Sequence, residues 1–484
     1  MPSLKQNFIY NAILTMSGYI FPLMVYPYVS RILGVSNIGA CNFVDSIVEY
    51  FTIISMMGMN TIGIREIAKC KGDRKKLDRT FSQLFSLNTI STLIAVVSLI
   101  LATLIISKFS DYKELLYIGI GKLFFNYLLI NWFFQGLENF KYIAIRTILI
   151  KVLFVVSVFI FVGTQDDTKI YYFLIFLTFA GNALVNLWYA KKIVTFRFTF
   201  HISKSIILSF IMLGVYWLMN SMYSTLNVAY LGFIANNTEV GYYTTANKLL
   251  LVIMTFFTTV TSVLVPRISN VLSSNTKKGM MQAKELINKA INALLLFVIP
   301  LIILVVYFSK SIISIMAGEG CGGAGTGYEG AILPLQIMAP LFFLIGYDQI
   351  IVLQTLLPLN KDKIILRNSS LAAAVGITTN ILLVPKFGSI GSAMVLILAE
   401  MVVLTTSQYS VKKYLGLSFP YVNLVKNAII MSPLSLICYG IKSIIYSEIF
   451  AFALCCILCI AYVLIAGVYI LKNKDLASTV SKIF

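Results

Sequence analysis

The stretch FSQLFSLNTISTLIAVVSLILATLIIS, residues 81–107, contains no charged side chain over 27 positions. A helix needs about 20 predominantly apolar residues to cross the ~30 Å hydrocarbon core of a bilayer. Residues 65–79, immediately before this stretch, contain seven Lys or Arg residues. An apolar run of this length beside a basic flank predicts a transmembrane helix whose preceding loop lies in the cytoplasm.

Similar apolar runs recur along the whole chain. There are fourteen of them, near residues 8–29, 38–62, 81–107, 115–135, 144–163, 170–190, 206–234, 240–265, 290–308, 331–357, 369–384, 390–411, 424–446 and 449–471. Of the 484 residues, 59% are hydrophobic and 12% are charged, whereas a soluble domain is about 25% charged. We therefore predict an all-α membrane protein with about fourteen transmembrane helices and no separate soluble domain.

The distribution of Lys and Arg predicts the orientation of these helices. If both termini are cytoplasmic, the inside segments carry 29 of the 38 basic residues and the outside loops carry seven. Basic residues favour the cytoplasmic side, so we expect both termini there. The net charge of +19 then fits anchoring at an anionic membrane surface, and no nucleic-acid partner is expected.

A weak internal repeat indicates two related halves. Residues 31–43 read RILGVSNIGACNF and residues 231–243 read LGFIANNTEVGYY, each a tight turn in which a glycine opens the next helix. The two glycines, Gly39 and Gly241, lie 202 positions apart, which is about six spans, and residues 387–393 are a third echo. Duplicated halves are typical of transporters. We predict a six-helix bundle at residues 1–205, a second at 206–411, and a terminal helix pair with a cytoplasmic tail at 412–484.

Charged side chains inside predicted spans are candidate functional residues, because a charge near the bilayer centre is costly unless it faces a partner or a cavity. They are Asp45, Glu49, Lys122, Lys248, Asp348 and Glu400, with Asn227 and Asn247 among their polar neighbours. Together they indicate a hydrated path between the two bundles. The alternative is buried ion pairing that fixes helix register, for instance between Lys248 and Asp45 or Glu49. Asp45 and Lys122 also lie near span ends, within reach of the membrane interface.

Three other patterns carry little functional weight. Residues 318–323 match the dinucleotide-binding glycine pattern, but they lie in a predicted outside loop without the strand and helix that this site requires. The stretch Cys455–Cys459 contains a C-x-x-C spacing, between Cys456 and Cys459, inside an apolar span, and His201 is the single histidine. We predict no metal site, no catalytic residue and no disulfide framework.

Several short segments together resemble one family. They are Ser30–Gly34 with Ile38–Gly39, Gly63–Ala68, Phe134–Glu138 with Phe140–Arg146, Val240–Tyr243 with Ala246–Lys248, and Val384–Gly388 with Ile390–Gly391. Their order and the fourteen spans resemble the Wzx-type polysaccharide flippases of the multidrug/oligosaccharidyl-lipid/polysaccharide exporter superfamily. One departure is Asn227, because many relatives have an acidic residue in the seventh span.

The resemblance implies a non-enzymatic flippase in the bacterial cytoplasmic membrane. Such a protein moves undecaprenyl-diphosphate-linked oligosaccharide repeat units from the inner to the outer leaflet by alternating access, for surface polysaccharides such as O-antigen. It implies no cofactor, although a proton or sodium gradient is the candidate energy source. The expected partners are the lipid-linked substrate, membrane lipids and other polysaccharide-assembly proteins, and a monomer suffices because two bundles make a complete path.

Residue roles follow from the chemistry of this substrate. A cation lowers the cost of moving a diphosphate through hydrocarbon, because it forms charge-assisted hydrogen bonds with the phosphate oxygens. The candidate substrate-binding residues are Lys248, Arg31, Lys122, Asn247, Asn227, Arg65 and Arg146. The candidate ion-coupling residues are Asp45, Glu49, Asp348 and Glu400. Arg65 and Arg146 are expected at the inside mouth, where anchoring to lipid is the alternative role.

Two other functions compete with the flippase. A drug or cation exporter of the same superfamily needs an acidic cavity, and the cations Lys122 and Lys248 argue against one. A membrane enzyme, such as a polysaccharide polymerase or ligase, needs catalytic groups on a large outside loop. The longest outside loop, residues 309–330, is rich in glycine and contains no His or Arg.

Overall fold

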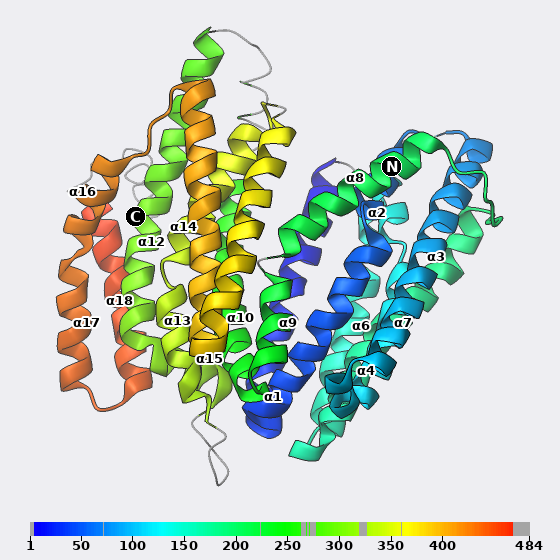
Figure 1. Ribbon diagram of the computed structural model, residues 1–484. Coiled ribbons are helices and arrows are strands. Elements are labelled where there is room, and N and C mark those ends of the chain that lie inside the picture. The colour runs from blue at the N-terminus through cyan, green and yellow to red at the C-terminus, as the bar shows by residue number, and fades with distance from the viewer. Residues whose placement is uncertain are drawn as a thin grey trace. The chain divides into compact units, whose positions relative to one another are not determined.

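The computed structural model describes residues 4–70, 72–222, 224–262, 268, 271, 277–318, 327–359 and 361–467. Every regular element within these ranges is a helix, so the predicted all-α class is confirmed (Figure 1). In the described ranges, nine helices are long and apolar enough to cross a membrane, or up to ten if the bent pair Tyr328–Met338 and Leu341–Leu356 is one span. The chain is a multi-pass membrane protein. The count of fourteen spans and the cytoplasmic termini stay predictions.

The helices form two compact units, one ending at Gly241 and one beginning at Tyr242. The first contains α1 (Leu4–Met56), α2 (Met59–Ala68), α3 (Arg74–Ile105), η1 (Ser107–Tyr112), α4 (Lys113–Tyr127), α5 (Asn131–Gly136), α6 (Phe140–Phe161), η2 (Gln165–Asp167), α7 (Thr168–Ile193), α8 (Lys204–Ser221), α9 (Thr225–Ile234) and the start of α10 (Asn237–Ser262). Helix α1 packs against α3, α4, α6 and α9. The division into bundles at residues 205 and 411 stays a prediction, and α8 and α9 pack on α1.

The second unit is arranged around α12. It contains the rest of α10, then α12 (Lys277–Ala317), η3 (Tyr328–Ala331), α13 (Ile332–Met338), α14 (Leu341–Asp348), the π-helical η4 (Gln349–Leu356), α15 (Asp362–Leu415), α16 (Tyr421–Met431), α17 (Pro433–Ile444) and α18 (Glu448–Ile465). Helices α13, α14, α16, α17 and α18 all contact α12. Cys455 and Cys459 are buried in the apolar cluster that α12, α17 and α18 share, as small core side chains. The tail after residue 467 lies outside the described residues.

Two glycines divide the longest helices where the sequence predicts junctions between spans. Helix α1 has 53 residues, and a straight helix of that length measures about 80 Å, more than twice the ~30 Å of hydrocarbon. Gly34 interrupts it with φ 75° and ψ 168°, a backbone conformation that is open to glycine and strained for other residues. Gly388 interrupts α15 in the same way, with φ 54° and ψ −126°.

The repeated glycines of the sequence lie against each other's turns. A Cβ atom placed on Gly39 would lie 1.7 Å from the carbonyl oxygen of Asn237, and one on Gly241 would lie 2.3 Å from the carbonyl oxygen of Val35. Backbone therefore meets backbone at both positions, and no larger residue fits. The repeat is thus used structurally, because each glycine admits the turn that contains the other.

Between α7 and α8, residues 194–203 are extended and run along α3; we name this segment the strap (Figure 1). The backbone N–H groups of Thr195, Arg197 and Thr199 donate to side chains of α3 at 2.9, 3.1 and 3.0 Å. The acceptors are spaced four residues apart on α3: Asp78 Oδ1, Ser82 Oγ and Ser86 Oγ. Two residues of strand rise about 6.6 Å and four of helix about 6.0 Å, so the two repeats match.

Candidate functional site

A buried lysine of the first unit forms an ion pair inside the membrane region. Lys122 on α4 places Nζ 2.8 Å from Oδ1 of Asp45 on α1, and the hydroxyl of Tyr172 on α7 donates to the same oxygen at 2.7 Å. Lys122 also lies over the Phe179 ring, 5.1 Å from its centroid. The carboxylate is thus held by helices α4 and α7 together.

Close packing of α4 on α1 makes this pair feasible. Gly119 lies one turn before Lys122, and a Cβ atom there would lie 2.5 Å from a methyl carbon of Val48. A larger residue at position 119 would push α4 away from α1 and lengthen the ion pair. The local sequence Gly-x-x-Lys therefore serves both the helix contact and the charge contact.

The pair is open on its acidic side. The Lys122 side chain is 11% exposed, whereas that of Asp45 is 36% exposed. Glu49, one turn along α1, is exposed and close enough to both to interact electrostatically. The prediction that Asp45 and Glu49 share a face agrees with this geometry. Asp45 holds the ammonium group of Lys122 among the helices, and the extension of Lys122 to the membrane interface stays a prediction.

In the second unit, the two candidate carboxylates lie side by side. Asp348 on α14 is 6% exposed, and its carboxyl group interacts with that of Glu400 on α15. Among the described residues, neither forms an ion pair with a lysine or arginine. Like charges this close repel each other unless a proton or a cation lies between them. The ion-coupling role of Asp348 and Glu400 stays a prediction.

Arg146 is buried between α5, α6 and α7, with only 6% of its surface exposed. Its guanidinium donates to Asn131 Oδ1 at 3.1 Å and to the carbonyl of Asn182 at 3.5 Å, and it lies over the Tyr142 ring. Asn131 begins α5 just after Ile130, which has a left-handed backbone with φ 39°. Arg146 thus stabilises the break between α4 and α5.

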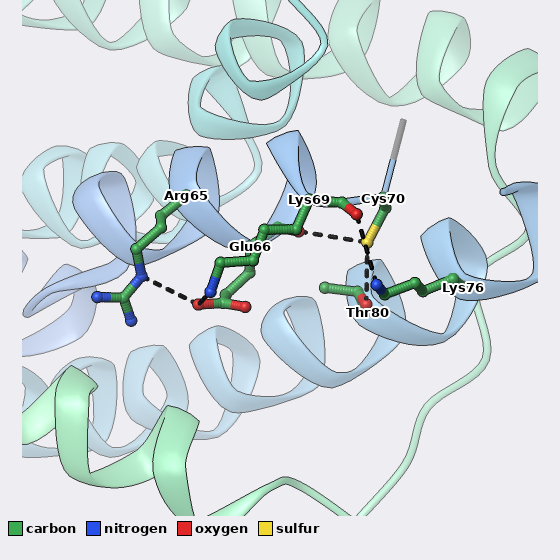
Figure 2. A network of polar contacts seen from close by, with 6 residues as sticks. All are labelled: Arg65, Glu66, Lys69, Cys70, Lys76 and Thr80. Carbon is green, nitrogen blue, oxygen red and sulfur yellow. Dashed lines mark hydrogen bonds and ion pairs between the residues drawn. The ribbon is translucent and has the colours of Figure 1, made fainter. Parts of the chain in front are cut away.

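Arg65 lies at the exposed end of α2, in the polar network that Figure 2 shows. Its Nε is 3.0 Å from Glu66 Oε1, which also accepts from Lys69 at 2.9 Å. Cys70 donates to the carbonyl of Glu66 at 3.2 Å and contacts Thr80 Oγ1 at 3.4 Å, so the network ties α2 to α3. One acid between two cations leaves this end of the unit positively charged.

The remaining candidates lie on α1, α9 and α10. Arg31 is exposed, Asn227 is fully buried, and Asn247 and Lys248 are half-buried. Two groups of predicted site residues interact in the structure: Lys122 with Asp45 and Glu49, and Asp348 with Glu400. Of the glycine pattern at residues 318–323, all but Gly318 lies outside the described residues.

Sequence reasoning missed two polar features. Tyr172 gave no signal, because a tyrosine in an apolar span is ordinary. The strap did give one: residues 194–203 read VTFRFTFHIS, with strict alternation of apolar and polar side chains. Over the part of the chain that the structure describes, no group of three or more His, Cys, Asp or Glu side chains is arranged to hold a metal ion.

Comparison with known proteins gives a family and a fold. Residues 4–272 match the family described as polysaccharide biosynthesis protein. The chain is 26% identical over 420 residues, covering 83% of this chain and 95% of the relative, to an Escherichia coli (strain K12) protein named "Putative O-antigen transporter". The fold of this chain is similar to that of a lipid II flippase, MurJ, in an inward closed conformation. The TM-score is 0.78 and the identity 16%, over 97% of this chain and 100% of the MurJ chain. An outward-facing MATE multidrug resistance transporter is more distant, with TM-score 0.53 and 12% identity over 85% of this chain and 94% of the other.

Proposed function

Because the chain belongs to the polysaccharide biosynthesis protein family, we propose that it is a flippase for lipid-linked oligosaccharides. The relative described as an O-antigen transporter, which this chain matches over most of both lengths, supports this assignment. The proposed substrate is an undecaprenyl-diphosphate-linked repeat unit, which moves from the inner to the outer leaflet of the bacterial cytoplasmic membrane. Two units that open alternately to either side would carry it.

The observation that carries the proposal is the ion pair between Lys122 and Asp45. Burial of an unpaired ammonium group costs roughly several kcal/mol of free energy. Asp45 therefore allows Lys122 to stay charged inside the membrane when no substrate is present. The pair is open on the carboxylate side. A diphosphate that arrives there can take over the ammonium group by charge-assisted hydrogen bonds, while Glu49 would repel it until neutralised.

Fourteen crossings are part of this proposal. Gly34 and Gly388 divide α1 and α15 into two crossings each, which adds two to the nine candidate spans. The bent pair η3–α13 with α14–η4 adds one, and α8–α9 and α10 add one each. An even number places both termini on the same side, and the Lys and Arg bias places that side in the cytoplasm.

Energy coupling is proposed for the carboxylates of the second unit. Asp348 and Glu400 would take up a proton or a sodium ion, since their mutual repulsion is relieved by either. No cofactor is involved in this proposal. Lys248, Asn247, Arg31 and Asn227 stay proposed contacts for diphosphate and sugar, and other polysaccharide-assembly proteins stay proposed partners of a monomeric flippase.

The test uses cells that lack this gene while the rest of the glycan pathway is intact. An outside-acting glycan label measures how much lipid-linked repeat unit reaches the outer leaflet. Wild type should restore labelling, Lys122→Ala and Lys248→Ala should each reduce it at least about tenfold, and Lys169→Ala, which removes an exposed lysine, should restore it fully. Normal labelling without the gene, once a redundant flippase is ruled out, would refute the proposal.

The carboxylate pair of Asp348 and Glu400 favours one competing function, a drug or cation exporter. Organic cations bind acidic cavities, and this pair is acidic. Export of an organic cation dye from cells that express the protein, unaffected by Lys122→Ala, would establish that function. Loss of glycan labelling without dye export would exclude it. A polymerase or ligase would instead lengthen the glycan in a reaction with purified protein.

A further inference from the structure

The strap and the first turns of α3 form a basic groove on the first unit. Its volume is about 450 Å³, and it is lined by Lys75, Asp78, Arg79, Ser82, Gln83, Thr195, Arg197, Thr199 and His201. Lys75, Arg79 and Arg197 are exposed, and none of them forms an ion pair with a described carboxylate. The groove thus offers three cations without an ion-pair partner against one carboxylate, Asp78, together with several hydroxyl and amide groups.

Asp78, the acidic residue in the groove, is used by the backbone. Its Oδ1 accepts the N–H of Thr195 at 2.9 Å, so it fixes the strap, and it forms no ion pair with Lys75, Arg79 or Arg197. Gln83 ties the other end by donating to the carbonyl of His201 at 3.0 Å. The groove is therefore built by hydrogen bonds from both ends of the strap, and its cations are held near one another.

The opposite face of the strap is aromatic. Phe196, Phe198 and Phe200 alternate with the polar residues of the groove, and Phe196 packs on Phe85 of α3 with ring centroids 4.7 Å apart. Phe198 and Phe200 are 47% and 79% exposed. Exposed aromatic rings beside Lys and Arg at a span end are typical of the boundary between lipid and water. One face of the strap thus suits the lipid and the other suits the headgroup layer.

From this arrangement we infer that the groove binds the phosphate headgroup of an anionic phospholipid. Lys75, Arg79 and Arg197 contact the phosphate oxygens. The hydroxyl groups of Thr195 and Thr199 donate hydrogen bonds to the same oxygens. Phe198 and Phe200 lie among the acyl chains. The site differs from the Lys122–Asp45 pair and is independent of the proposed transport, because it requires no translocation. It would hold the strap at the membrane surface.

Native mass spectrometry of the full-length protein tests this inference. The probes are phosphatidylglycerol, phosphatidylcholine and a polyprenyl diphosphate, each added to protein in detergent. The groove variant is R79Q/R197Q, and the matched control is K412Q/K413Q, which removes two charges from the end of α15. Each cation near an anionic surface contributes about 1 kcal/mol, so phosphatidylglycerol should bind the groove variant about thirtyfold more weakly. The control should bind like wild type.

Each result decides the inference. If the groove variant binds phosphatidylglycerol more weakly than wild type does, and all proteins bind phosphatidylcholine weakly, the inference is supported. Equal phosphatidylglycerol binding by wild type and both variants overturns it. If the groove variant loses binding of the polyprenyl diphosphate alone, the phospholipid assignment is overturned and the groove holds a substrate headgroup. The glycan-labelling assay distinguishes a failure of this inference from a failure of the proposed flippase. A groove variant that no longer binds phosphatidylglycerol but still restores glycan labelling leaves the proposed flippase intact.

Discussion

Lys122 and Asp45 in the first unit are a pair of opposite charges, whereas Asp348 and Glu400 in the second unit are two carboxylates side by side. The first pair is neutral as it stands, because each charge is the partner of the other. The second becomes neutral only when it takes something up. The two units thus differ in how their buried charges are arranged: in the first a cation faces an anion, and in the second two acids face each other.

The largest expected effect is that of Lys122→Ala. It leaves Asp45 without its cation, and removal of one partner of a fully buried pair costs about 3–5 kcal/mol. Because Asp45 is partly exposed, we expect about 2 kcal/mol, measured as a lower midpoint of thermal unfolding in detergent. The double variant D45N/K122A removes both charges and should regain most of this loss. A double variant no more stable than Lys122→Ala would contradict the charge pairing.

The change of aspartate to asparagine should have opposite signs in the two units. Asp45→Asn leaves the buried Lys122 unpaired and should destabilise the protein. Asp348→Asn relieves the repulsion with Glu400 and should stabilise it by about 1 kcal/mol, while ion-driven transport is lost. The measurement is the thermal unfolding midpoint of each variant relative to wild type, which we expect to fall for Asp45→Asn and to rise for Asp348→Asn. Destabilisation by both would show that Asp348 has a positively charged or donating partner.

Tyr172→Phe gives a smaller effect within the first pair. The ring is fully buried and phenylalanine has the same shape, so the substitution removes only the hydrogen bond to Asp45. We expect a loss of about 1 kcal/mol and little change in glycan labelling. A loss as large as that of Lys122→Ala would mean that the tyrosine, and not the lysine, is the main support of Asp45.

The smallest effect is expected at an exposed pair of the same type. Lys169 and Glu114 form an ion pair in which both side chains are mostly exposed, and such pairs contribute at most about 1 kcal/mol. Lys169→Ala should leave the thermal midpoint within error of wild type. A shift comparable to that of Lys122→Ala would show that burial does not explain the difference between the two lysines.

The sequence predicted the fold class and the two junctions that interrupt the longest helices. Long apolar runs require helices in lipid, and the breaks predicted between residues 29 and 38 and between 384 and 390 contain Gly34 and Gly388. The mutual contact of Gly39 and Gly241 was visible only as a repeat. Close approach of two turns depends on packing, which a span pattern does not contain.

The partners of the membrane charges were not predictable to the same degree. The pairing of Lys122 with Asp45 was not among the ion pairs that the sequence suggested, for which Lys248 with Asp45 or Glu49 was the example. The reason is that α4 is apolar on nearly every side, so its sequence does not indicate which face meets α1. Gly119, which brings the two helices close, is one glycine among 29. The burial of Arg146 on α6 was also not visible in the sequence, because it depends on contacts with Asn131 and Asn182.

The three hydrogen bonds between the strap backbone and the side chains of α3 have a consequence for how this protein tolerates insertions and deletions. Since side chains alternate along an extended chain, one residue added between positions 195 and 199 would turn the phenylalanines toward water and the arginine toward lipid. Two added residues would keep the phenylalanines and the polar side chains on their present faces, and would shift the hydrogen bonds to α3 by one repeat of two strap residues. Functional homologues should therefore differ in this segment by even numbers of residues, so a region that looks like an ordinary loop is expected to evolve in steps of two.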